Sequence, residues 1–167
     1  MRNILLLLTA AVVFVLVNYN IWQREGLVTS GRTVLLELAP VDPRSFMQGD
    51  YMALGFKITN EAFPNDKIKG MRDGRLVLAV DASKVATFRR FADNVQPAAD
   101  EVLLRYRIRN GQPKFASNAF YFQEKQGDYY RDAKYGEFRV STDGEAILVA
   151  LRGADLQTLG PKSSERH

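Results

Sequence analysis

The chain has 167 residues, a formal net charge of +4, no cysteine and a single histidine, His167. The lack of cysteine excludes disulfides, thiol nucleophiles and cysteine-ligated zinc or iron–sulfur centres. Because the one histidine lies on a polar tail, we also expect no Ser-His-Asp catalysis and no histidine-ligated metal. The expectation is therefore a protein without a metal or another cofactor.

An apolar segment occupies residues 4–17, and Ile21 and Trp22 extend it after a short polar interruption. Read as one helix, residues 4–22 have the length of about 20 residues that crosses a bilayer core. Tyr19 and Trp22 would then lie at the level of the headgroups. Arg2 before the apolar run favours a cytoplasmic N-terminus and an extracytoplasmic C-terminal part. We expect residues 1–24 to be an uncleaved signal-anchor helix.

A cleavable signal peptide is the alternative interpretation of this segment. Residues 4–17 also have the length expected for the apolar core of such a peptide, about 7–15 residues. A signal peptidase needs small residues just after that core, and the sequence there reads NYNIWQRE. The retained anchor is therefore the preferred interpretation.

The charge of the chain becomes nearly balanced once the anchor is set aside. Removing Arg2 and Arg24 from the 23 basic residues leaves 21, against 19 acidic residues. A nucleic-acid-binding domain needs a concentrated positive face. We therefore expect no nucleic-acid partner.

The remaining sequence predicts many short strands. Residues 101–109 (EVLLRYRIR) give the clearest one, with Leu104, Tyr106 and Ile108 on one face and the arginines on the other. Residues 84–91 fit either a hairpin partner of the strand at 75–81, which we prefer, or a short helix. The other expected strands cover residues 33–39, 51–58, 114–123, 137–141 and 146–151.

Turn signals separate several of these strands. Residues 110–113 (NGQP) predict a turn, and Thr142-Asp143-Gly144-Glu145 predicts a tight hairpin because Asp-Gly readily adopts the positive φ values it needs. One or two helical turns are expected within residues 124–134. The fold expected for residues 25–159 is mainly β, either one antiparallel β-sandwich or a small open barrel with a short helix. Residues 160–167 read as a disordered tail.

The most distinctive segment is PVDPRSFMQGDYMALGF, residues 40–56. It resembles the GDYxxLxY family of small, membrane-anchored bacterial proteins without assigned activity. Gly49, Asp50, Tyr51 and Leu54 match the motif, and Phe56 stands where the final tyrosine would be. The resemblance implies an anchor in the bacterial inner membrane, a single pass, an extracytoplasmic β domain and an integral-membrane protein partner.

The motif also has a physical interpretation as the entry to a strand. Gly49 permits a backbone conformation that a Cβ would penalise, and Asp50 can accept hydrogen bonds that fix a turn. Tyr51 would begin a strand in which Met52, Leu54, Phe56 and Ile58 share an apolar face.

The loop before the motif holds candidate functional residues. Asp42, Arg44 and Asp50 form either a polar recognition site or an internal clamp in which Arg44 bridges carboxylates, and the clamp is preferred. Ser45 precedes Gly49 and is a candidate nucleophile, although a serine after Pro-Arg is more often a turn residue. Carboxylates at residues 124, 128, 132 and 137 read as solvated charge without calcium-loop spacing.

Two further surfaces follow from the strand patterns. Arg105, Arg107 and Arg109 on one strand face could contact anionic headgroups near the bilayer, or be a solvent-facing stripe balanced by acids on an adjacent strand, which we prefer. Among the aromatic residues after position 114, Tyr121, Tyr129 and Tyr130 are the candidates for an exposed surface.

The function expected from the sequence is that of a non-enzymatic binding or accessory module for another membrane protein. The first alternative is a hydrolase that uses Ser45 or a carboxylate pair. The second is binding of a small ligand or lipid inside the β domain, which a sizeable apolar cavity would favour.

Overall fold

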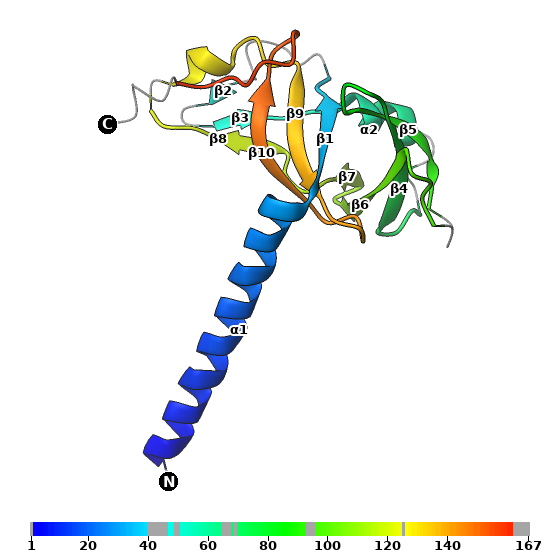
Figure 1. Cartoon of the computed structure of the whole chain (residues 1–167). Coiled ribbons are helices and arrows are strands. Elements are labelled where there is room, and N and C mark those ends of the chain that lie inside the picture. The colour runs from blue at the N-terminus through cyan, green and yellow to red at the C-terminus, as the bar shows by residue number, and fades with distance from the viewer. Residues whose placement is uncertain are drawn as a thin grey trace.

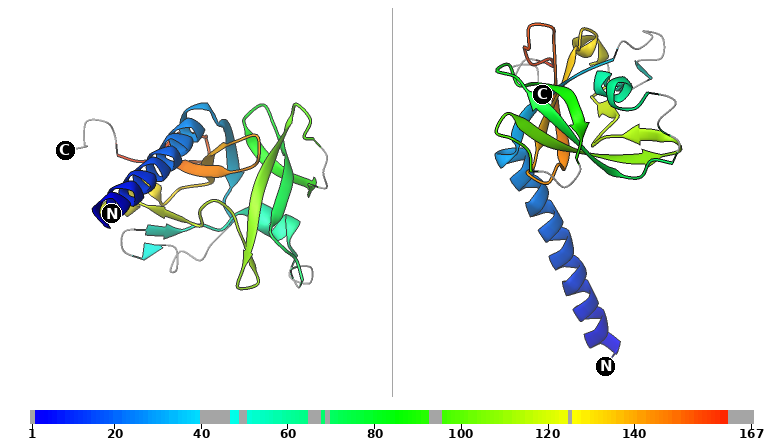
Figure 2. Two further views of the ribbon diagram at one scale, coloured as in Figure 1. Left: turned by 90° about the horizontal axis from the view of Figure 1, so that it is seen from below. Right: turned by 90° about the vertical axis from the view of Figure 1, so that its right-hand side faces the viewer.

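The computed structural model describes residues 2–39, 47–48, 51–64, 68, 70–92, 96–124 and 126–161. It consists of a long helix, α1 (Arg2–Ser30), and a β domain into which that helix leads directly (Figure 1). Figure 2 shows from two further directions that α1 leaves the β domain on one side and continues away from it.

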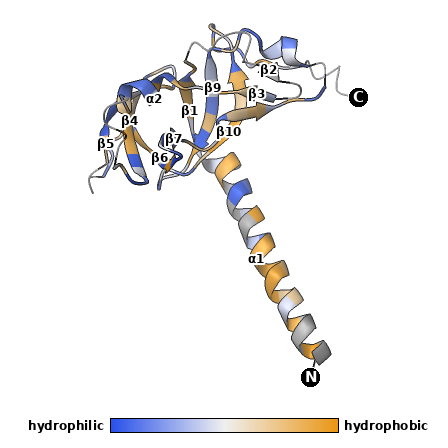
Figure 3. Ribbon diagram, turned by 180° about the vertical axis from the view of Figure 1, so that it is seen from behind, coloured by the Kyte–Doolittle hydropathy of each residue, from blue (hydrophilic) through white to orange (hydrophobic). Residues whose placement is uncertain are grey.

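The surface of α1 is apolar and exposed. Twelve large apolar or aromatic side chains between Ile4 and Val28 are at least 43% exposed, up to 71% for Trp22. Figure 3 shows hydrophobic colour along much of the coloured part of α1 and a hydrophilic turn close to the domain. Within the part of the chain that the structure describes, no helix has both the length and the hydropathy required to cross a membrane. The expected transmembrane span is therefore not supported by the structure.

Seven strands form one curled, open sheet with the order β10-β9-β1-β5-β4-β6-β7. A smaller sheet has the order β2-β3-β8. The strands of the large sheet are β1 (Arg32–Glu37), β4 (Gly74–Val80), β5 (Val85–Phe91), β6 (Glu101–Arg109), β7 (Gln112–Lys114), β9 (Tyr135–Val140) and β10 (Ala146–Arg152). The small sheet contains β2 (Met47–Gln48), β3 (Tyr51–Ala53) and β8 (Ala119–Tyr121). Two short helices complete the described elements, α2 (Lys57–Ala62) and the 3-10 helix η1 (Gly127–Tyr130).

The expectation of a mainly β domain with a short helix is confirmed, but the sheet is mixed rather than wholly antiparallel. β1 pairs with β5 in parallel, with Leu35 opposite Val85, and every other strand pair is antiparallel. A parallel pair needs a crossover connection. Here the chain between β1 and β5 passes through the small sheet, α2 and β4 before it returns.

Several expected elements form as predicted. β6 has the expected bounds, β4 and β5 form the preferred hairpin, and β9 and β10 flank the expected Asp-Gly turn. Asn110 and Gly111 have φ values of +52° and +70°, as in a type I′ hairpin turn between β6 and β7. η1 supplies the helical turn expected within 124–134.

The prediction of one strand over residues 51–58 is wrong. β3 ends at Ala53, Phe56 forms an isolated bridge with Leu38, and α2 begins at Lys57. Met52, Leu54, Phe56 and Ile58 are nevertheless all at most 5% exposed. Ile58 and Ala62 lie four residues apart on one helix face, and both are buried. Burial therefore followed the apolar pattern, while the backbone changed from strand to helix within it.

The expected strand over residues 114–123 is also interrupted. β7 ends at Lys114 and β8 begins only at Ala119. Phe115 lies between them, is buried, and makes edge-on contact with Phe56 at a ring-centroid separation of 6.0 Å. Packing of this ring into the core accounts for the break, because the chain turns inward there instead of staying in the sheet.

The core fills the inside of the curled sheet. Phe56 contacts both Phe115 and Phe138, and Phe63 packs against Tyr106 with ring centroids 4.8 Å apart. Aromatic pairs in these edge-on geometries add to the burial of their large apolar area. The interior is thus occupied by side chains, and the hollows on the described residues lie elsewhere, on the surface.

Candidate functional site at the junction of α1 and the β domain

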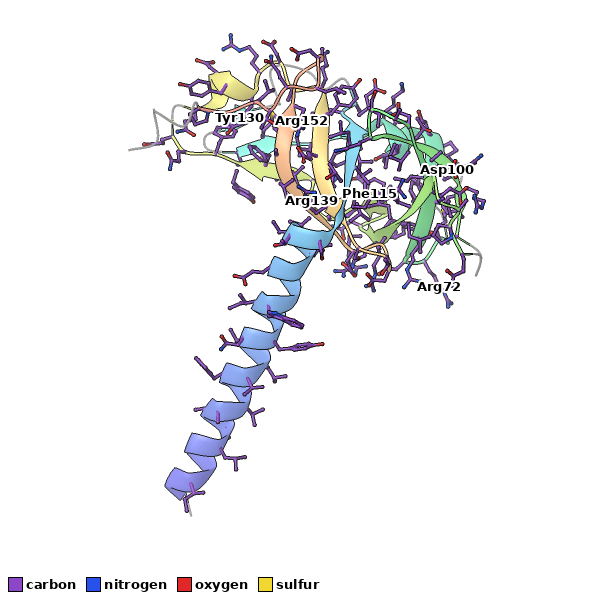
Figure 4. All side chains as sticks on the ribbon, in the orientation of Figure 1. Arg72, Asp100, Phe115, Tyr130, Arg139 and Arg152 are labelled. Carbon is purple, nitrogen blue, oxygen red and sulfur yellow. The ribbon has the colours of Figure 1, made fainter. Side chains whose placement is uncertain are left out.

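A single residue, Gly31, connects α1 to β1, an interior strand of the large sheet. Its N–H donates to the carbonyl of Leu27 at 2.9 Å. A Cβ on Gly31 would lie 2.4 Å from that carbonyl oxygen and 3.0 Å from Cβ of Arg139. Arg139 Nη1 also donates to Thr33 Oγ1 at 2.5 Å, and Figure 4 shows Arg139 where α1 meets the sheet. The close approach fixes how the helix enters the domain.

The turn between β9 and β10 lies on the same side of the domain as α1. Arg32 at the start of β1 pairs with Val140 at the end of β9, so the turn follows next to the helix. Gly144 in the turn has a φ of +91°, and its carbonyl accepts a hydrogen bond of 2.8 Å from Arg105 N on β6. This contact brings one end of the β9–β10 hairpin against the far part of the curled sheet.

Four hollows surround this turn. Their volumes are about 520, 520, 420 and 160 Å³. Thr142 lines both of the larger ones, and Glu145 lines both of the smaller ones. Leu27 on α1 lines the second and third hollows, so the helix forms part of their wall. The described surface is therefore hollowed where α1 joins the β domain.

The two smaller hollows are rich in positive charge. Arg24 on α1 lines both, together with Arg107 on β6, while Arg105 and Lys114 line the smaller one. We call these four residues the basic cluster. Arg105 forms an ion pair with Glu145, and Nη2 of Arg107 lies 3.9 Å from the same carboxylate. The carboxylate of Glu145 thus lies within ion-pair distance of both Arg105 and Arg107.

A second charged group supports the loop beside the larger hollows. The side chain of Glu101 is only 3% exposed and accepts hydrogen bonds from Arg90 Nη2 at 3.0 Å, Arg89 Nη1 at 3.1 Å and the Ala98 N–H at 3.0 Å. Arg32 Nη1 donates to the backbone carbonyl of Glu101 at 3.0 Å. Hydrogen bonds from Arg90, followed by that from Ala98 N–H, lower the pKa of Glu101 from 4.5 to about 2.

Some of the site residues predicted from the sequence lie outside the described residues, and the others have structural positions in the fold. Asp42, Arg44, Ser45, Gly49 and Asp50 lie outside the described residues. The remaining motif residues belong to the fold: Leu54 and Phe56 are buried, and the ring of Tyr51 lies against that of Tyr121 with a centroid separation of 5.8 Å.

The predicted aromatic surface needs one correction. Tyr121 is 75% exposed and Tyr129 is 43% exposed. Tyr130 is buried, and its ring packs against Phe120 and Phe122 with centroid separations of 5.0 and 5.5 Å. Burial also raises the pKa of Tyr130 above its usual value. Tyr130 is therefore part of the core and not of the exposed surface.

The arginine stripe on β6 is balanced by acids, although they are not all on an adjacent strand. Arg109 donates to Asp73, which lies just before β4, and Arg105 pairs with Glu145 in the β9–β10 turn. Lys114 was missed as a member of this surface. The NGQP turn signal could have identified it, because a two-residue turn at Asn110 and Gly111 places Arg107 opposite Lys114.

Beside the junction, the hydroxyl group of Ser141 donates a hydrogen bond to the Asp143 carboxylate within the β9–β10 turn. This is the geometry of a local cap and not that of an activated nucleophile. Among the described residues, no group of three His, Cys, Asp or Glu side chains is placed to hold a metal ion.

Comparison with known proteins gives a family match. The family model described as GDYXXLXY protein matches residues 13–151, which is most of the chain. No curated protein matches the sequence. No solved structure matches it either.

Replacing Gly31 with alanine should weaken the joint between α1 and β1. The added Cβ would overlap the Leu27 carbonyl, and overpacking of this kind costs about 1–3 kcal/mol. We expect Gly31→Ala to lower the midpoint of thermal unfolding of the full chain in detergent. Gly26→Ala is the matched control, since nothing lies within 4 Å of its Cβ and alanine favours a helix interior. Equal stability of Gly31→Ala and the unmodified chain would show that the close approach is not a constraint.

Glu101 should make the domain sensitive to acid. Its pKa is lower in the folded state, so its ionised form contributes stability that is full above about pH 4.5 and is lost as the pH falls toward 2. Glu101→Gln should be less stable than the unmodified chain at neutral pH and should show a smaller decrease in the unfolding midpoint between these two pH values. Asp128→Asn, at an exposed ion pair, is the control. Parallel pH curves for Glu101→Gln and the unmodified chain would contradict this role.

Proposed function

The chain belongs to the GDYXXLXY family, and we propose that it is a membrane-attached binding module of the bacterial inner membrane. In this proposal α1 is held in the bilayer with its N-terminus in the cytoplasm, and the extracytoplasmic β domain binds or supports an integral-membrane protein. The observation that carries the proposal is the exposed apolar surface of α1.

That surface is not confined to one face of the helix. Residues 12–17 are six consecutive residues, and all are exposed. At about 100° per residue they span the whole circumference of an α-helix. A protein partner docked on one face would leave some of them in water, whereas lipid surrounds a helix on all sides. A bilayer therefore suits this segment better than a groove on another protein.

The direct connection between α1 and β1 would determine which side of the β domain faces the membrane. Because only Gly31 separates the two elements, the hollows around the β9–β10 turn would face the membrane. Integral-membrane proteins are the partners within reach of such a surface. This supports an accessory role toward one of them.

The two alternatives from the sequence have less support. Ser45, Asp42 and Asp50 lie outside the described residues, so no geometry favours a hydrolase. A ligand inside the β domain would need an apolar cavity, and the inside of the curled sheet is filled by buried side chains such as Phe56 and Phe138.

Attachment and topology can be tested by labelling, because the chain has no cysteine of its own. Arg131→Cys places a thiol on a side chain that is 73% exposed in the β domain, and Asn3→Cys places one before the apolar run. In intact spheroplasts a membrane-impermeant maleimide should label position 131 and not position 3, and both should react after lysis. Labelling of position 3 alone would reverse the proposed orientation. Extraction of the chain by alkaline carbonate would overturn the attachment.

The partner can be tested with a photo-crosslinking residue. At Thr142, in the turn beside α1, it should yield a defined adduct with an integral-membrane protein in living cells. The matched control is Asp132, an exposed residue just after η1, near the start of β9 at the other end of that strand. Adducts of the same pattern from both positions, or none from Thr142, would contradict a partner at the junction.

A further inference from the structure

We propose that the basic cluster, Arg24, Arg105, Arg107 and Lys114, binds the phosphate of anionic phospholipid headgroups. This inference rests on the proposed attachment of α1 to a bilayer. It goes beyond attachment because it assigns a lipid-recognition site to the β domain itself.

The first argument is a pair of like charges placed side by side. Arg107 on β6 and Lys114 on β7 are directly opposite each other in the antiparallel register. Cβ atoms of such cross-strand neighbours lie about 4.5–5.5 Å apart, and like charges there destabilise a sheet. An anion bound between the two side chains would remove that repulsion. The like-charge pair therefore lowers the stability of the free domain, and it places two cations where they could hold a phosphate.

The second argument is an incomplete local balance of charge. The two smaller hollows bring four cations together with two carboxylates, Asp143 and Glu145. Glu145 is the carboxylate of both Arg105 and Arg107. Neither Arg24 nor Lys114 has a carboxylate within 4.0 Å among the described residues. The remaining positive charge is concentrated in the hollow of about 160 Å³ that all four cations line.

The third argument is the position of the cluster along α1. Trp22 is the last residue of the apolar part, and its ring lies 6.4 Å from that of Tyr19. Aromatic rings of this type settle at the headgroup level. Arg24 is two residues further on, or about 3 Å along the helix axis. The basic cluster would therefore lie at the depth of the lipid phosphates.

The bilayer is also the source of anions that this geometry favours. A site tethered beside a membrane experiences headgroups at a high effective concentration. A soluble acidic peptide or nucleic acid would have to enter the narrow space between the β domain and the membrane to reach the same hollow. We therefore assign the site to a lipid phosphate.

The test is to reconstitute the full chain into vesicles of phosphatidylcholine with a minority of phosphatidylglycerol. The protein is then extracted with its surrounding lipid in polymer discs, and the ratio of the two lipids is measured by mass spectrometry. The unmodified chain should retain phosphatidylglycerol in excess over the bulk ratio. Because each basic residue near an anionic surface contributes on the order of 1 kcal/mol, Arg107→Gln with Lys114→Gln should weaken this preference by about thirtyfold.

The matched control is Arg131→Gln with Lys134→Gln, which removes the same charge from exposed positions near the start of β9, away from α1. It should keep the full preference. A purely structural role of the basic cluster is tested by thermal unfolding. Relief of the like-charge pair predicts that Lys114→Gln unfolds at the same temperature as the unmodified chain or higher.

The outcomes separate the two proposals. Failure of the chain to enter vesicles of phosphatidylcholine alone would overturn the proposed attachment and this inference together. Insertion with an unchanged lipid ratio in Arg107→Gln with Lys114→Gln would overturn the inference alone. The same would follow if both double variants lost the preference equally, because the effect would then be one of net charge.

Discussion

The structure depends on the absence of a linker between α1 and β1, an interior strand of the sheet. Ser30 ends the helix, Arg32 begins β1, and the residue between them has no side chain. The Leu27 carbonyl accepts the Gly31 N–H and blocks any Cβ at that position. The helix and the sheet are therefore joined through one closely packed residue. Whatever holds α1 therefore also orients the β domain.

The curl of the sheet brings residues from other strands close to the junction of α1 and β1. β1 is an interior strand, with β9 and β10 on one side and β5, β4, β6 and β7 on the other. The hydrogen bond from Arg105 to Gly144 brings the β9–β10 turn onto β6, close to the end of the helix. Residues far apart in sequence, such as Arg24 and Lys114, line one hollow beside this contact. The basic cluster is a product of the tertiary fold.

How much could be predicted from the sequence depended on the range of the interactions. The bounds of β6 and the two hairpins at β4–β5 and β9–β10 followed from alternation and turn residues, which act over a few positions. The parallel pairing of β1 with β5 could not be predicted in this way, because it depends on the path of the intervening residues. The aromatic side chains show the same limit, since Tyr130 enters the core through contacts with Phe120 and Phe122.

The motif segment shows why an apolar pattern can be correct about burial and wrong about the backbone. Phe56 has extended dihedrals, φ −119° and ψ 137°, and stands at the boundary of α2. The alternating residues before it fit a strand, and Ile58 with Ala62 fits one face of a helix. Period two and period 3.6 overlap for a few residues around such a boundary. At this boundary Phe56 packs against Phe115 and Phe138, contacts that the local pattern does not reveal.

The distribution of charge completes the argument for a membrane-facing surface. Several arginines elsewhere in the described domain lie beside carboxylates, as Arg109 does with Asp73 and Arg152 with Glu137. The pKa of Asp73 lies below its usual value, chiefly because its carboxylate accepts a hydrogen bond from the Ile108 N–H. Burial raises this pKa, and the hydrogen bond from Arg109 lowers it further. Such pairs hold loops and strands in place. In the basic cluster, Glu145 is the carboxylate of both Arg105 and Arg107, so cations exceed carboxylates there, beside the helix α1 whose apolar side chains are exposed all around. The two features have a common explanation if the same bilayer supplies hydrocarbon to α1 and phosphate to the cations above it.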